Sequence, residues 1–255
     1  MGTAGAALAL VILGASVLLR LTTEFDTSGA PISTLPSSIE NAVRLTHRVT
    51  AAAVGLIAIA LTWMCWRRKT NLSYAFSPTV GIVAATVLLA IIGPLTPGYR
   101  YATVTIANVV GGSILLMSCW WLRETSAYSK AQVMGKNNTV AVAMFLFLTH
   151  IATGAATSAL HVRGMDWVGF VHIGSALLFL FTAGEILWTR SGDPTSTKLA
   201  ARLTGILLLQ IAMGLILMWL GRQPVWLAVV HALVSQVFAA GLVSLGMQSR
   251  QLPPE

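Results

Sequence analysis

Residues 167–189 read WVGFVHIGSALLFLFTAGEILWT, a run in which Glu185 is the only formally charged side chain. A run of about 20 mainly apolar residues is long enough to cross the hydrocarbon core of a bilayer as an α-helix. His172 lies five residues after the start of this run. Because ionisable side chains are rare inside membranes, this histidine indicates a function as well as a place in the packing.

Seven further runs in the sequence are also mainly apolar and about as long as a membrane-spanning helix. Hydrophobic residues make up 56% of the 255 positions and charged residues only 9%, which excludes an ordinary water-soluble domain. We therefore predict an all-α integral membrane protein with eight transmembrane helices. The expected ranges are 4–19, 41–66, 77–96, 101–122, 138–160, 167–189, 199–221 and 225–247.

The basic residues are distributed unevenly between the two sides of these helices. Ten of the sixteen, including all four Lys, fall on the side that holds the two chain ends, and the other side holds six Arg. Since cytoplasmic loops keep the excess of positive charge, we expect both termini in the cytoplasm and the protein in the plasma membrane, surrounded by lipid. The net charge of +8 is scattered and not interleaved with aromatic residues, which argues against nucleic acid as a partner.

A near-constant spacing predicts an internal repeat. His172 follows His47 by 125 positions, and His231 follows Asn108 by 123. The polar segment 123–138 lies close to the midpoint of the chain. We expect two four-helix bundles, residues 1–128 and 129–255, related by a pseudo-twofold axis along the membrane normal.

Histidines on three of the even-numbered helices are the candidate metal ligands. His47, His172 and His231 each lie five to six residues after the start of their run, so their depths agree within roughly 3 Å. Two neutral imidazoles on facing helices at one depth suit the axial positions of a haem iron. We predict that His172 and His231 bind haem; the alternative for each histidine is a hydrogen bond to a neighbouring helix.

Charged residues of the outer side supply the remaining candidates. Arg48, Arg163 and Arg222 are expected to contact haem propionates, because guanidinium groups pair with carboxylates in a bidentate manner. Glu40 lies seven residues before His47 and therefore on the same helix face. It either orients a proton or ligand there, or is a helix-start carboxylate stabilised by the helix dipole.

His150 lies in the middle of the fifth run and is expected to have no partner at its depth. Two interpretations remain open for it: it lines the edge of a haem, or it donates to a backbone carbonyl.

Short motifs at the outer side resemble the heme A synthase family of cytochrome oxidase assembly proteins. They are Leu19-Arg20-Leu21-Thr22 with Ser28-Gly29, and Thr46-His47-Arg48 at the second helix. The resemblance covers nearly the whole chain. It implies haem b held by His172 and His231 in the second half, and haem O as a substrate beside His47 in the first half. It further implies oxidation of the haem O C8 methyl to a formyl group, and haem O synthase or a terminal oxidase as partners.

Two positions depart from that family, and both belong to the first half. Asn108 occupies the place of a second substrate-side histidine, and Arg44 that of a glutamate, so Glu40 is the nearest acid to His47. With Glu40 and His47 as catalytic residues, the chain is expected to be a haem-dependent oxidoreductase. The departures favour the alternative, a non-catalytic haem-binding subunit or assembly factor of a terminal oxidase. A transporter without haem is a third alternative, which the unbroken helices disfavour.

Overall fold

The computed structural model describes residues 1–25, 31–67, 75–95, 102–127, 138–161, 167–190, 197–220 and 224–248. These residues form eight α-helices, as the sequence predicts, and the all-α fold is confirmed. The helices are α1 (Gly2–Leu21), α2 (Ser37–Arg67), α3 (Phe76–Ile92), α4 (Ala102–Ala127), α5 (Asn138–His161), α6 (Val168–Arg190), α7 (Thr197–Trp219) and α8 (Val225–Gln248).

Seven of the helices are long and apolar enough to cross a membrane, and α3 is the shorter one. The sequence predicts this helix over 77–96, but it ends at Ile92 and continues as the 3-10 turn η2 (Gly93–Leu95). Pro94 accounts for the difference, because proline has no backbone N–H to donate to the preceding turn and its ring clashes with that turn. The seven spans and the large apolar side chains exposed on them make the chain an integral membrane protein.

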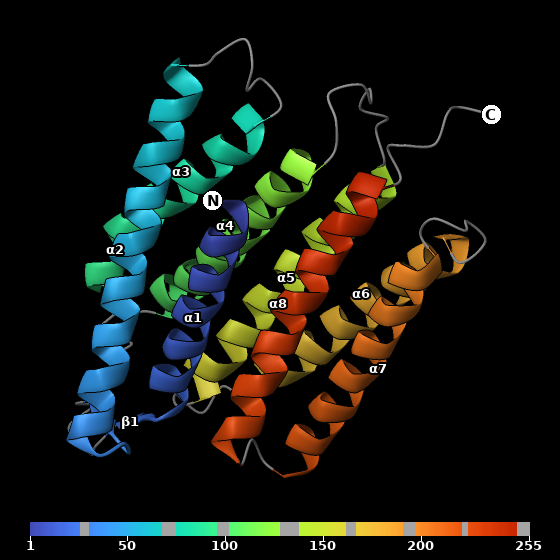
Figure 1. Ribbon diagram of the computed structural model, residues 1–255. Helices are drawn as coiled ribbons and strands as arrows, with labels where there is room; N and C mark the ends of the chain where they lie inside the picture. The colour runs from blue at the N-terminus through green and yellow to red at the C-terminus, as the bar shows by residue number, and fades with distance from the viewer. Residues whose placement is uncertain are drawn as a thin grey trace.

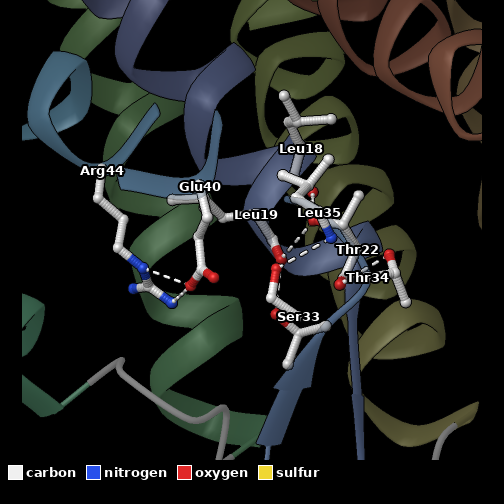
Figure 2. Close-up of polar contacts among 9 residues, drawn as sticks. Leu18, Leu19, Thr22, Ser33, Thr34, Leu35, Glu40 and Arg44 are labelled. Atoms are coloured by element: carbon white, nitrogen blue, oxygen red, sulfur yellow. Dashed lines mark hydrogen bonds and ion pairs between the residues drawn. The ribbon is translucent and has the colours of Figure 1, made fainter. Parts of the chain in front are cut away.

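A small hairpin lies between α1 and α2, in the segment that separates the first two predicted helices. Strand β1 (Thr23–Phe25) pairs with strand β2 (Pro31–Ser33) in an antiparallel register that places Thr23 opposite Ser33. Thr22 ends α1, and its hydroxyl donates to the Leu18 carbonyl at 2.8 Å. The Thr34 hydroxyl in turn donates to the Thr22 carbonyl at 3.1 Å, so the hairpin is tied to the end of α1 (Figure 2).

The centre of the bundle is formed by α1, α4, α5 and α8, and the remaining helices lie in pairs on either side of them (Figure 1). α4 contacts α1, α3, α5 and α8, while α1 also contacts α2 and α8. α2 and α3 cover one end, and α6 and α7 cover the other. α1 begins and α8 ends at the same end of the molecule, and the β1–β2 hairpin lies at the opposite end.

Two hydrophobic clusters fill the interior. The first takes its buried residues from α1 to α4 and from Ala75, and the second takes them from α5 to α8 together with Met117 of α4. Each half of the chain thus buries its own apolar side chains, and α4 joins the two clusters.

A buried polar contact pins α4 to α8 near the end of the molecule where α1 begins. The Ser244 hydroxyl donates to Oε1 of Glu124 at 3.0 Å, and the Trp120 indole N–H donates to the Ser244 oxygen at 2.8 Å. Glu124 is only 5% exposed and is also paired with Arg123. Ser244 therefore satisfies two groups that lipid cannot hydrogen-bond.

We expect Ser244→Ala to lower the free energy of unfolding by about 1–3 kcal/mol, because it leaves a buried indole N–H without an acceptor and removes a donor from a buried carboxylate. Thermal unfolding in detergent, followed by circular dichroism, measures the effect. Ser235→Ala is the matched control, because the buried Ser235 hydroxyl donates only to the Ala232 carbonyl of its own helix. Equal midpoints for the two variants would contradict this role of Ser244.

Candidate functional site

His172 is held against α5 by contacts on two sides of its ring. It lies on the first turns of α6, and its Nδ1 is 3.2 Å from the hydroxyl oxygen of Thr153. A Cβ added at Gly154 would lie 2.9 Å from Cε1 of His172, so the ring fits closely over a position that has no side chain. The absence of a side chain at Gly154 therefore permits close approach of α5 and α6 at this contact.

His150 packs directly on His172, contrary to the prediction that it has no partner at its depth. The two rings are parallel within 11°, with centroids 4.3 Å apart. Nδ1 of His150 lies 3.2 Å from the Ser175 hydroxyl of α6, so a side chain and not a backbone carbonyl is its partner. The prediction was wrong because it counted depth along the backbone, whereas an imidazole ring lies well away from its own Cα.

His231 has one partnered and one unpartnered ring nitrogen. Its Nε2 lies 3.1 Å from the side-chain amide nitrogen of Gln210 on α7. Its Nδ1 is buried and has no hydrogen-bond partner among the described residues, and neither has Oε1 of Gln210. Because an amide nitrogen only donates, Gln210 donates to Nε2 in this orientation, and Nδ1 of the neutral His231 ring carries the proton. Leaving such a buried group unsatisfied costs about 1–3 kcal/mol.

The second half of the chain brings three imidazoles into one region. His231 is close enough to His150 and His172 to interact electrostatically with both. No group of three or more His, Cys, Asp or Glu side chains that could hold a metal ion exists within the described ranges. A haem iron needs only two axial side chains, because the porphyrin supplies its other ligands.

His47 lies apart from this region, between α1 and α2. Its Nδ1 is 3.3 Å from the Ile12 carbonyl oxygen of α1. Because a carbonyl oxygen only accepts, Nδ1 carries the proton and the lone pair of the neutral ring is on Nε2. This is the tautomer in which a histidine ligates a metal through Nε2 while its other nitrogen is held by the backbone.

An open groove of about 630 Å³ lies between α1, α2 and α8. That volume is within the range of small-molecule sites. Thr46 lines it next to His47, and Val229 lines it from α8, two residues before His231. Its other lining residues are Val11, Gly14, Ala15, Leu18, Ser38, Ile39, Ala42 and Val43.

Glu40 is engaged by Arg44 one turn later on the same helix. Nε and Nη2 of Arg44 lie 2.7 and 2.5 Å from Oε1 of Glu40, and Figure 2 shows the pair beside the hairpin. Arg48 is exposed on α2, and Asn108 is half-buried on α4. The remaining candidates, Arg163 and Arg222, lie outside the described residues.

Several residues of this region were not singled out from the sequence. Thr153, Ser175 and Gln210 supply the side-chain partners of the histidines. The sequence does contain a signal for Thr153. His150, Thr153 and Gly154 are spaced so that they share one helix face in an otherwise apolar run. Gln210 is likewise an isolated amide within an apolar helix.

No known protein-family model matches the chain, and no curated protein matches it.

We expect Gly154→Ala to lower the free energy of unfolding by about 1–3 kcal/mol, since the new methyl group would overlap the confined His172 ring. Gly174→Ala is the matched control: it lies on α6 two residues after His172, and a Cβ there meets nothing within 4 Å. Thermal unfolding of both variants in detergent tests the difference. If the two alanines had the same effect, the close fit of His172 over Gly154 would not matter for stability.

Proposed function

We propose that this chain is a haem-binding membrane oxidoreductase of the heme A synthase type, which oxidises the C8 methyl group of haem O to a formyl group. In this proposal both termini lie in the cytoplasm, and two four-helix bundles, 1–128 and 129–255, are related by a pseudo-twofold axis. The separate hydrophobic clusters of the two halves support the duplication. So do His47 and His172, each of which contacts the helix that precedes its own.

The unpartnered nitrogen of His231 is the observation that carries the haem proposal. One ring nitrogen of His231 faces Gln210 while the other is buried without a partner. Metal-ligating histidines donate through their non-ligating nitrogen, so ligation by Nδ1 of His231 would require the Gln210 amide to turn and present Oε1 as the acceptor for Nε2–H. His172, whose Nδ1 contacts Thr153, has the same kind of support, so the residues present fit axial ligation of haem b by His172 and His231.

The residues of the first half are proposed to bind and orient the substrate. His47, with its lone pair on Nε2, would hold haem O next to the apolar groove, whose side chains would contact the macrocycle. Arg48, Arg163 and Arg222 would contact propionates. Glu40 would accept protons, with Arg44 favouring its charged form.

The reaction converts a methyl group and one water into a formyl group, four protons and four electrons. It proceeds as two hydroxylations, each of which removes two electrons, followed by loss of water. A bound haem b supplies one-electron redox chemistry between the substrate and an external acceptor. We take that acceptor to be dioxygen or a membrane quinone.

We expect the purified protein to show the absorption spectrum of a low-spin haem with two histidine ligands. His172→Ala and His231→Ala each remove one axial ligand, so either change should abolish that spectrum. Ser235→Ala, a buried change on the same helix as His231, should retain it. A colourless wild-type protein from haem-supplied cells would refute the haem site.

Catalysis is tested by co-expression with a source of haem O and by extraction of the pigments. The wild type is expected to accumulate haem A, and His47→Ala to lose this activity. Glu40→Gln should lower the rate by about 10²–10⁴-fold if Glu40 transfers protons. Ser38→Ala, a change at the groove wall that removes no ionisable group, serves as the control.

A second function is favoured by two observations in the first half. Asn108 is a poor iron ligand, and Glu40 is paired with Arg44 instead of lying free beside His47. The alternative is a non-catalytic haem-binding subunit or assembly factor of a terminal oxidase. Bound protohaem without haem A, together with copurification with the oxidase at a fixed ratio, would support it over the enzyme.

A further inference from the structure

We propose that His150 is a positioning residue that fixes the plane of the His172 imidazole and so stabilises axial haem ligation. The inference rests on the proposed haem site, and it assigns a role to His150, a buried histidine that the site itself does not use. The juxtaposition that carries it is the parallel stack of the two rings across the α5–α6 contact.

The ring of His150 is intercalated between two rings of α6. Its centroid lies 4.3 Å from that of His172 and 6.0 Å from that of Phe179, and it is parallel to both within 11°. Phe179 follows His172 by seven residues, so the two lie on one helix face, separated by a rise of roughly 10.5 Å. The two centroid distances together are close to that rise, from which we infer that the His150 ring lies between the other two.

Hydrogen bonds determine which edge of each ring faces the α5–α6 contact. The hydroxyls of Thr153 and Ser175 lie 2.8 Å apart and donate to the backbone carbonyls of His150 and His172 or to each other. Their oxygens therefore accept from Nδ1–H of His172 and of His150, respectively. Both rings then have their lone pair on Nε2, as axial ligation by His172 requires.

The remaining freedom of His172 is rotation of its ring about χ2. Thr153 holds one edge and Gly154 leaves no room beneath Cε1, but neither covers the ring face. His150 covers that face, and His150 is itself held by Phe179 and Ser175. Partners that orient a metal-ligating imidazole in this way typically contribute 10–100-fold to metal affinity, by an order-of-magnitude comparison.

The test compares His150→Ala with His150→Phe in the purified, haem-loaded protein. Alanine removes the stacked ring, whereas phenylalanine keeps a flat ring and loses only the hydrogen bond to Ser175. Phe147→Leu is the control, because Phe147 is one turn away in the same buried cluster and contacts Phe179 instead of His172. The measurements are the rate of haem transfer to apomyoglobin and the largest g value of the ferric haem.

We expect His150→Ala to release haem about 10–100-fold faster than the wild type and to shift the largest g value. His150→Phe keeps the stacked ring but loses the hydrogen bond to Ser175, so it should change both measurements in the same direction as His150→Ala but less, whereas Phe147→Leu should stay close to the wild type. Ser175→Ala, which frees one edge of His150 without opening the aromatic core, should change both measurements in the same direction as His150→Ala but less. If His150→Ala does not fold, Ser175→Ala still tests whether the orientation of His150 affects haem binding.

Release rates and g values that are the same in His150→Ala, Ser175→Ala and Phe147→Leu would overturn the positioning role while leaving the haem site intact. A wild-type protein without haem would instead overturn the proposed function itself. The two failures are therefore distinguishable.

Discussion

Hydrogen bonding of polar side chains inside an apolar helical bundle is the constraint on which the second half of this protein depends. Neither lipid nor neighbouring Leu and Ala side chains can satisfy an imidazole. The hydroxyls of Thr153 and Ser175 and the amide of Gln210 therefore lie at the histidine nitrogens. One histidine nitrogen, Nδ1 of His231, has no such hydrogen-bond partner among the described residues, and an external group can supply it.

Most of the fold could be predicted from the sequence, because helix length and composition are one-dimensional properties of a membrane span. The eight apolar runs correspond to α1–α8 with ends that differ by a few residues. The difference at the end of α3 arises from Gly93 and Pro94, whose local effect hydropathy does not register. The β1–β2 hairpin was missed because two strands of three residues leave no periodic pattern.

The site could be predicted only in part, because depth along a helix says nothing about rotation around its axis. His172 and His231 were chosen for their equal depth, and the structure does place them in one region. Their partners come from α5 and α7, and finding those requires the helix rotations and the packing order. The stack of His150 on His172 shows this limit most clearly, since the two backbones suggest different depths while the rings touch.

The two halves differ in a way that suits different roles for their proposed haem groups. A resident cofactor is retained by a closely fitted site, and His172 is enclosed by His150, Thr153 and Gly154. A substrate must enter and leave, and the residue before His47 lines an open groove that α1, α2 and α8 form with small and branched apolar side chains. Two separate hydrophobic clusters can serve these different needs, because the side chains that fill one cluster differ from those that fill the other.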